Sequence, residues 1–339
     1  MAIEIKATGR AIPAKRLTNT ELPAGIDTSD DWIRSHTGIG SRHIADDAVA
    51  CSDLALSAAR SALTFALEQD GVQEKTLEEI ALTLDMIILG TATADYYGCP
   101  STACIIQNKL GAKNAGAMDI SAGCSGFIYG LEIASGLLSI NPARKRALVI
   151  GSEVLSRFLD WNDRGSCVLF GDGAGAALLE KTDNPKRGIL RTILKADGSG
   201  SDHLMIKRGG SRNCFKSGEV VDIHPHVEMN GRAVYIFAVR AMTEIIAQLM
   251  EAEGVGVDDL RWIVPHQANA RIVSAAAKRL SIPDEKFVLN IEEYANTSSA
   301  SIPIVLDELN RGGKLRRGDL IMTVGFGAGL TYGGNLIVF

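Results

Sequence analysis

Two side chains, Cys124 and His266, stand where a short apolar run meets the start of a helical pattern. Cys124 lies in DISAGCSGF, just before the small-residue helix pattern GFIYGLEIASGLL. A helix N-terminus presents free N–H groups and the positive end of the helix dipole, which both favour a thiolate. The position therefore predicts an activated cysteine nucleophile. The alternative is a small buried cysteine without a chemical role.

His266 lies in WIVPHQANARI, after a strand-like run and before another helix pattern. An imidazole that emerges from the end of a buried strand is placed to donate a hydrogen bond or to act as a base. Asn296, in YANTSSASIP, carries an amide that can donate to a developing oxyanion. The alternatives are a structural histidine and an asparagine that caps a helix or a turn.

The elements that must position these side chains alternate between strands and helices. Apolar runs at 148–150 and 320–324 predict buried strands. Small and apolar residues recur at helical spacing over 53–69, 125–138 and 234–252, which predicts helices there. Alternation of this kind is typical of an α/β fold.

A weak internal repeat gives the organisation of the chain. From Leu84 and again from Leu260 the order is strand, polar turn, small-residue helix, linker, strand, and a turn that opens a second helix. Cys124 and Asn296 occupy matching places at the ends of the two copies. The glycine-rich segments FGDGAGAALL at 170–179 and VGFGAGLTYGG at 324–334 close them. We expect two similar halves, 1–180 and 181–339, packed so that equivalent turns meet.

Composition excludes several classes of protein. The 339 residues are 46% hydrophobic and 22% charged with a net charge of -5, so a strongly basic nucleic-acid-binding domain is not expected. The six cysteines show no C-x-x-C pattern, which predicts reduced thiols. The chain shows no signal-peptide pattern, and its most apolar stretch, 80–94, is too interrupted to span a membrane. We expect a cytoplasmic protein that binds neither membranes nor nucleic acid.

Two further patterns carry no ligand site by themselves. His224 and His226 flank a proline without other nearby ligands, so no metal is expected. The glycine-rich runs lack the spacing and the lysine of a nucleotide-binding P-loop. The polar segment 208–229 is expected to be a surface insertion over the mouth of a tunnel.

Ordered motifs resemble the β-ketoacyl-[acyl-carrier-protein] synthase III family of condensing enzymes. DTSDDWIRSHTGIGSRHIA at 27–45 is similar to its N-terminal signature, and DISAGCSGF, VPHQANARI and YANTSSASIP are similar to its cysteine, histidine and asparagine motifs. The segments at 163–179 and 325–333 are also similar. A cysteine–histidine–asparagine set resembles this branch more than thiolases or elongating synthases. The resemblance implies a thiolase-like fold with five layers, αβαβα.

The resemblance also implies a reaction, without a cofactor, that starts fatty-acid synthesis. Cys124 attacks an acyl-CoA and holds the acyl group. His266 and Asn296 then stabilise the enolate formed when malonyl-acyl-carrier protein loses CO2, and this carbanion attacks the acyl-cysteine. The backbone N–H groups of Cys124 and Ala328, where the family commonly has glycine, form the oxyanion hole. A specialised enzyme of secondary metabolism and a non-catalytic acyl-binding relative remain as alternatives.

The same resemblance assigns the binding surfaces. Trp32 and Arg164 are expected to enclose the adenine of CoA, and His36 stands where many members have arginine. The other residues expected to line the CoA and pantetheine tunnel are Thr28, Thr37, Gly231, Tyr235 and Asn269.

Assembly and specificity are assigned in the same way. An acidic carrier protein is expected to dock on Arg271, Lys278 and Arg279. We expect a homodimer that pairs through the strand and loop before Cys124. The acyl pocket is expected to involve Leu169, Phe326 and Cys99 of the partner. The sequence does not specify the starter.

Overall fold

Two mixed sheets with the same strand order form the framework of the computed structural model, which describes residues 2–71, 76–218 and 225–339. The first sheet has the order β1-β7-β6-β4-β5. Its strands are β1 (Ala2–Ala11), β4 (Met86–Gly90), β5 (Gly116–Ile120), β6 (Arg146–Glu153) and β7 (Gly173–Thr182). The second sheet has the order β8-β13-β12-β11. Its strands are β8 (Gly188–Ala196), β11 (Trp262–Pro265), β12 (Leu320–Gly327) and β13 (Thr331–Val338).

Strand directions repeat from one sheet to the other. In each sheet the first three strands pair antiparallel, and the next pair is parallel: β6 with β4 in one, and β12 with β11 in the other. The first sheet ends on a full parallel strand, β5. At the corresponding place the second sheet has only a parallel bridge between Ile263 and Phe287. The predicted repeat is therefore present in the topology, with its last strand reduced in the second copy.

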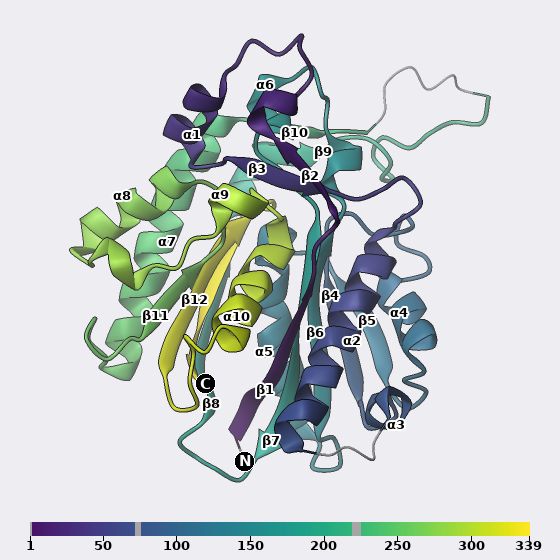
Figure 1. Cartoon of the computed structure of the whole chain (residues 1–339), viewed down its shortest axis with the longest axis vertical. Coiled ribbons are helices and arrows are strands. Elements are labelled where there is room, and N and C mark those ends of the chain that lie inside the picture. Colours follow the sequence, from purple (N-terminus) through teal and green to yellow (C-terminus); the bar gives the residue numbers. More distant parts are fainter. Residues whose placement is uncertain (1, 72–75, 219–224) are drawn as a thin grey trace.

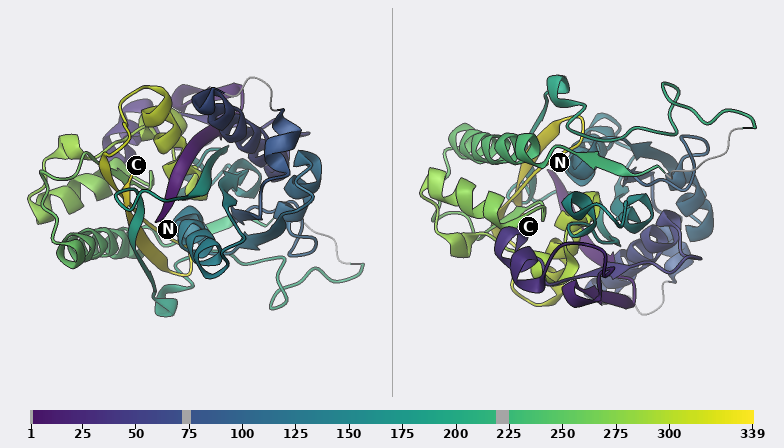
Figure 2. Two further views of the ribbon diagram at one scale, coloured as in Figure 1. Left: turned by 90° about the horizontal axis from the view of Figure 1, so that it is seen from below. Right: turned by 90° about the horizontal axis from the view of Figure 1, so that it is seen from above.

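Helices cover both sheets and also fill the space between them, as Figures 1 and 2 show. One outer layer contains α2 (Cys51–Asp70), α3 (Leu77–Ala81) and α4 (Thr102–Leu110), and the other contains α7 (Gly231–Glu253) and α8 (Ala270–Leu280). The helices α5 (Gly126–Ile140) and α10 (Ser301–Arg311) lie between the sheets. The five-layered αβαβα prediction is confirmed.

Three apolar clusters correspond to these layers. Alanines and leucines of α2 pack on the outer face of the first sheet. The inner faces of both sheets meet α5 and α10 in the second cluster, and α7 and α8 pack on the other sheet in the third. Because the central cluster draws on both halves, the halves form one core. β7 extends to Thr182 and β8 begins at Gly188, so the break between the sheets lies a few residues after the predicted boundary at 180/181.

A close contact between glycines sets the depth of α5. A Cβ atom on Gly90, at the end of β4, would lie 2.6 Å from the carbonyl carbon of Gly126. A Cβ on Gly126 would lie 2.9 Å from the Cα of Gly90. Only two glycines permit this approach of helix to strand. It fixes the N-terminus of α5, and so Cys124, at the carboxyl end of the sheet.

Short elements assemble over the carboxyl ends of both sheets, at the top of Figure 1. They comprise the strand pairs β2 (Lys15–Thr18) with β3 (Ser41–Ile44) and β9 (Leu204–Ile206) with β10 (Val227–Met229). The helices there are α1 (Asp30–Thr37), α6 (Arg164–Cys167) and α9 (Ile291–Tyr294).

The apolar helices of the core also meet a length criterion for membrane crossing. Gly123–Ile140 and Gly231–Glu253 are long and apolar enough by composition, and half of each window is buried inside the fold. Both helices contribute to the apolar clusters described above. All six cysteines are free, as the sequence predicted.

Candidate active site

Cys124 lies in a tight turn between β5 and α5, inside the short 3-10 helix Gly123–Ser125. Gly123 adopts φ 51°, a left-handed conformation that suits glycine. A Cβ on Gly123 would lie 2.7 Å from the amide nitrogen of Ala328, and one on Gly327 would lie 2.4 Å from that of Cys124. The turn that carries the cysteine therefore touches the end of β12 from the other half. Ala328 itself is not among the residues with positive φ, so its Cβ causes no backbone strain.

The thiol of Cys124 is more deeply buried than its place at a helix N-terminus suggested. Burial raises the pKa of the thiol to about 12. Hydrogen bonds from the Ser298 side chain and from the backbone of Cys124 and Ala328 act in the opposite direction. Loss of hydration on burial thus opposes the thiolate more strongly than the helix N-terminus and these hydrogen bonds favour it.

His266 is buried directly after β11, and its backbone N–H donates to Val324 of β12 at 2.8 Å. Burial lowers the pKa of the imidazole to about 3, so the ring is neutral at physiological pH. Its Nδ1 lies 2.7 Å from Ser301 Oγ, a hydroxyl that accepts the N–H of Gln267 at 3.4 Å. The hydroxyl proton of Ser301 is then free to donate to Nδ1, and this arrangement leaves the proton of the neutral ring on Nε2.

Asn296 is oriented by its own turn. Its Oδ1 accepts the backbone N–H of Ser298 at 2.8 Å, so the amide oxygen is occupied and the NH2 group faces the cavity. Its backbone N–H donates to Leu169 at 2.9 Å. The flanking residues Ala295 and Ser298 have φ values of 56° and 50°, which are unusual for residues with a side chain. Backbone strain of this kind is characteristic of functional turns.

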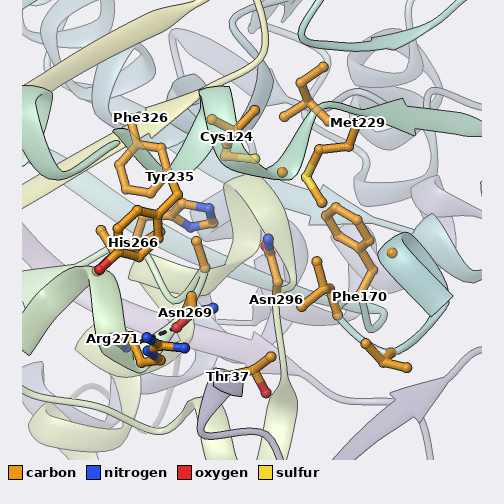
Figure 3. A pocket seen from close by; sticks show the side chains of 18 of the residues that line it. Thr37, Cys124, Phe170, Met229, Tyr235, His266, Asn269, Arg271, Asn296 and Phe326 are labelled. Atoms are coloured by element: carbon orange, nitrogen blue, oxygen red, sulfur yellow. Dashed lines mark hydrogen bonds between the residues drawn. The ribbon is translucent and has the colours of Figure 1, made fainter. Parts of the chain in front are cut away.

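Cys124, His266 and Asn296 line one cavity of about 390 Å³, shown in Figure 3. The three residues come from different elements and direct their polar atoms toward a shared space. The cavity extends from Cys124 toward α1 and α8. The residues of the expected CoA tunnel that line it are Trp32, Thr37, Arg164, Gly231, Tyr235 and Asn269.

Thr28 differs from the other expected CoA residues, because it is not among those that line the cavity. Its Oγ1 is buried without a hydrogen-bond partner within the ranges that the structure describes. Asn269 has a structural role as well. It caps α8 by accepting the N–H of Arg271 at 2.8 Å, and its Nδ2 donates to the backbone oxygen of His36 at 3.1 Å.

The outer end of the cavity is a stack of three side chains. The guanidinium of Arg164 lies 4.9 Å from the centre of the Trp32 ring, and His36 stacks on the same ring with centroids 4.4 Å apart. Arg164 also donates to the backbone oxygen of Asp27 at 2.7 Å. Because Arg164 and Trp32 are in direct contact, an adenine can enter between them only if the arginine moves.

The replacement of the usual arginine by His36 can be interpreted from its contacts. The Nδ1 of His36 lies 2.8 Å from the backbone oxygen of Trp32, which assigns a proton to that nitrogen. Nε2 then donates to a phosphate only in the charged ring. Arg34 is already engaged by Asp30 at 2.9 Å and Glu292 at 2.7 Å. These ion pairs disfavour Arg34 as a substitute phosphate ligand.

A second cavity, of about 350 Å³, is also lined by Cys124. Its walls include aliphatic side chains from the loop after β6 and from β9 and β10: Leu155, Leu204, Met205, Ile206 and Val227. Phe170 and Leu204 line both cavities. The sequence analysis missed all of these residues. The only indication of them in the sequence was the short apolar run at 204–206, which lies next to the polar segment 208–229.

Two residues of the expected acyl pocket, Leu169 and Phe326, line the first cavity and are not among those that line the second. Phe326 packs edge-on against His266, with ring centroids 5.4 Å apart. Cys99 is exposed on the loop after β4, and its reach into a partner's pocket stays a prediction.

The segment 208–229 is only partly a surface insertion. Its end forms β10, which pairs with β9 and contributes Val227 and Met229 to the cavity walls. His224 lies outside the described residues. The proposed docking residues Arg271, Lys278 and Arg279 are exposed on α8, and Arg271 also lines the mouth of the first cavity.

Comparisons with known proteins agree over nearly the whole chain. Residues 118–198 match the family described as 3-oxoacyl-[acyl-carrier-protein (ACP)] synthase III, and residues 250–339 match its C-terminal family. A β-ketoacyl-[acyl-carrier-protein] synthase III of Caldanaerobacter subterraneus subsp. tengcongensis is 46% identical over 99% of this chain and 98% of that protein.

Two solved structures resemble this chain in both fold and sequence. The 3-oxoacyl-[acyl-carrier-protein] synthase III of Aquifex aeolicus VF5 has a TM-score of 0.87 and 42% identity, covering 99% of this chain and 100% of that one. The priming β-ketosynthase of the R1128 polyketide biosynthetic pathway has a TM-score of 0.86 and 32% identity, covering 99% of this chain and 96% of that one.

Proposed function

The chain belongs to the β-ketoacyl-[acyl-carrier-protein] synthase III family, and we propose on that premise that it condenses an acyl-CoA starter with malonyl-acyl-carrier protein. The product is a 3-oxoacyl-acyl-carrier protein, the first intermediate of fatty-acid synthesis. The observation that carries the proposal is the convergence of Cys124, a neutral His266 and the amide of Asn296 on one cavity.

Acyl transfer is the first half-reaction. The thiol of Cys124 loses its proton, and its sulfur attacks the thioester carbonyl of acyl-CoA. The tetrahedral intermediate collapses to acyl-cysteine and CoA, whose sulfur takes up a proton. The backbone N–H groups of Cys124 and Ala328 are proposed as the oxyanion hole. This is supported by the interactions of both backbone groups with the Cys124 sulfur, which lower the pKa of the thiol.

Condensation is the second half-reaction. The thioester oxygen of malonyl-acyl-carrier protein accepts hydrogen bonds from Nε2–H of His266 and from the NH2 group of Asn296. As CO2 leaves, charge develops on that oxygen and these donors stabilise the enolate. The carbanion then attacks the acyl-cysteine and releases the thiol. A neutral histidine suits this step, since it donates a hydrogen bond without needing to lose a proton.

The two cavities suggest where the parts of the substrate lie. The first cavity leads from Trp32, Arg164 and His36 to Cys124, and we assign it to CoA and the pantetheine arm. The second cavity has aliphatic walls, and we assign it to the acyl group. No cofactor takes part in this proposal.

Exposed cations on α8 favour an acidic protein partner. Arg271, Lys278 and Arg279 lie on α8 and form no ion pair within the ranges that the structure describes. We assign this face of the helix to docking of the carrier protein, whose acidic surface complements it.

A homodimer is proposed from the free edge of the first sheet. β5 pairs only with β4, and its residues are partly exposed, so its outer backbone groups are available to a second copy. The neighbouring loop exposes Tyr96 and Tyr97 by 57% and 66%. We further propose that the enzyme is cytoplasmic, because its acyl-CoA and carrier-protein substrates are made there.

The test is a panel of acyl-CoAs scored for condensation with malonyl-acyl-carrier protein. We expect a 3-oxoacyl-acyl-carrier protein with at least one starter. Transfer of the acyl group to Cys124 without condensation would instead favour an acyl-binding relative.

A second candidate is a priming role in secondary metabolism. It is favoured by the likeness to the priming ketosynthase of the R1128 pathway. Deletion of the gene distinguishes the two roles. Loss of fatty-acid initiation supports the first role, and intact initiation supports the second.

A further inference from the structure

The fully buried carboxyl group of Glu153, at the end of β6, has no part in the reaction described above. Its Oε2 accepts the hydroxyl of Thr93 at 2.7 Å and the backbone N–H of Ala92 at 3.1 Å. Its Oε1 lies 3.0 Å from Ser298 Oγ and 2.8 Å from Ser299 Oγ. The side chain thus joins β6 to the turn that carries Asn296.

The number of protons around Ser299 indicates the state of this carboxyl group. Ser299 Oγ lies 2.7 Å from the backbone oxygen of Gly90 as well as 2.8 Å from Glu153 Oε1. A carbonyl oxygen only accepts, and a serine hydroxyl has a single proton. When Ser299 donates to Gly90, the contact with Glu153 is a hydrogen bond only if Oε1 carries a proton. Burial acts in the same direction, because it raises the pKa of Glu153.

Ser298 connects this carboxyl group to the nucleophile. Its hydroxyl lies 3.0 Å from Glu153 Oε1, and its interaction with the sulfur lowers the pKa of the Cys124 thiol; Ser298 and Cys124 line the same second cavity. With a neutral Glu153, Oε1–H can turn from Ser299 to Ser298, and Ser298 can then direct its own proton to a thiolate. A carboxylate would only accept, so it would hold the Ser298 proton away from the sulfur.

We propose that Glu153 is a buried, protonated positioning residue. By donating its acid proton to the Ser298 oxygen, it leaves the Ser298 hydroxyl proton free to donate a hydrogen bond to the Cys124 thiolate during acyl transfer. No proton leaves the network in this step. The hydrogen bonds of Glu153, Ser298 and Ser299 change direction, the thiol proton passes to water, and the departing CoA thiolate takes up a proton from water. The inference rests on the proposed role of Cys124 as nucleophile.

The experiment measures the thiol without any acyl substrate, so it separates this inference from the proposed function. The rate at which iodoacetamide alkylates Cys124 is followed against pH in the full-length protein, and intact mass identifies the modified residue. The ionisable groups around the thiol are Glu153 from β6 and His266 after β11. Cys51 of α2 reaches the network through Thr91.

Glu153→Gln is the principal variant. An amide keeps an accepting oxygen and a donating NH2 group and never ionises, so it resembles a protonated carboxyl group. We expect the apparent pKa of Cys124 to stay unchanged and the alkylation rate at neutral pH to stay within about twofold. If Glu153 is ionised, removal of its negative charge lowers the thiol pKa, and alkylation becomes about tenfold faster or more. That acceleration would overturn the proposal.

Ser298→Ala and Ser299→Ala form a matched pair, since both serines contact Glu153 and only Ser298 contacts the sulfur. We expect Ser298→Ala to slow alkylation about tenfold or more, because a hydrogen bond to a charged atom is lost. Ser299→Ala should change the rate far less. Equal rates in the two variants would contradict the assigned direction of the network.

A spectroscopic measurement covers the case in which Glu153→Gln does not fold. Infrared spectra of the wild-type protein with isotope-labelled glutamate distinguish a protonated carboxyl group from a carboxylate. A labelled carboxylic-acid carbonyl band at neutral pH supports the proposal. Its absence shows that the buried group is ionised and overturns it.

Discussion

The turn that carries Cys124 and the turn that carries Asn296 occupy equivalent places in the two halves, yet they differ in strain and surroundings. In the first turn the residue with the left-handed backbone conformation is Gly123, which adopts it without a steric clash. In the second turn Ala295 and Ser298 have positive φ values, which strain a residue that has a side chain. The first turn follows a complete strand with a free edge, and the second follows a single bridge at Phe287. One framework thus carries the proposed nucleophile and a strand with a free edge in one half, and the proposed hydrogen-bond donors in the other.

The largest effect is expected from substitution of Cys124 in the first turn. Cys124→Ser should abolish acyl-enzyme formation, because a serine hydroxyl is far less ionised and no base is assigned to it. Intact mass spectrometry after incubation with acyl-CoA measures the covalent adduct. Acylation of another cysteine at the native rate would remove the distinction between the two turns.

Substitutions of the proposed donors in the second half should lower the rate of condensation and leave the rate of acylation unchanged. In His266→Ala and Asn296→Ala, loss of one donor to the enolate should cost about 100-fold or more in the condensation rate and spare acylation. Single-turnover measurements separate acylation by acyl-CoA from reaction with malonyl-acyl-carrier protein. Equal losses in both half-reactions would show that the two turns do not divide the work.

The free edge of the first sheet predicts an asymmetry in assembly. Met118→Lys places a charge on β5 and should weaken dimerisation about tenfold or more, because the charge loses hydration at the interface. Leu289→Lys is the control in the second half, two residues after the bridge at Phe287, where the leucine is 42% exposed. Sedimentation should show dissociation for the first variant and no change for the second.

A smaller effect is expected from the residue that sets the tautomer of His266. Ser301→Ala should reduce condensation about tenfold, because Nδ1 loses its donor and the proton is no longer held on Nε2. Nitrogen NMR of the labelled histidine reports which ring nitrogen carries the proton. Ser301→Thr restores the hydroxyl and should recover the rate, which a merely structural defect would not do.

The smallest expected effect concerns pH: the condensation rate should show no titration of His266. Since burial lowers the pKa of His266 to about 3, the ring remains neutral as pH falls from 8 to 5. The condensation rate constant should therefore show no inflection near 6.5, the ordinary pKa of a histidine. A pH profile measured on pre-acylated enzyme tests this. An inflection there that disappears in His266→Ala would show that the second half uses a charged imidazole.

The sequence was sufficient for the framework and for the residues in its turns. Periodicity located α2, α5 and α7 to within three residues at each end, and the repeat predicted that the turns of Cys124 and Asn296 are equivalent. These features are local in the chain, and the motifs around both residues are specific. The reduction of the fifth strand to a bridge at Phe287 had no local signal, because strand pairing depends on tertiary packing.

What the sequence missed depends on burial and on contacts between distant segments. The position of Cys124 before α5 suggested a thiolate, but the enclosure of its sulfur by the other half reversed the balance. The walls from β9 and β10 were missed because each strand has only three residues, too few for a periodic pattern. The protonation of Glu153 could not be predicted either, because the argument depends on contacts of Ser299 with Glu153 and Gly90, which are distant in the sequence.

The contact between Arg164 and Trp32 has a consequence for the kinetics of CoA binding. The arginine occupies the face of the indole where an adenine would stack, so the protein competes with its own ligand. Only the fraction of molecules with the arginine swung away can bind, and the apparent affinity falls by that fraction. The observed association rate should then level off at high CoA concentration, at the rate of side-chain opening. In the proposed CoA site, the first step of donor binding is therefore the opening of this outermost stack, before the thioester reaches the cysteine.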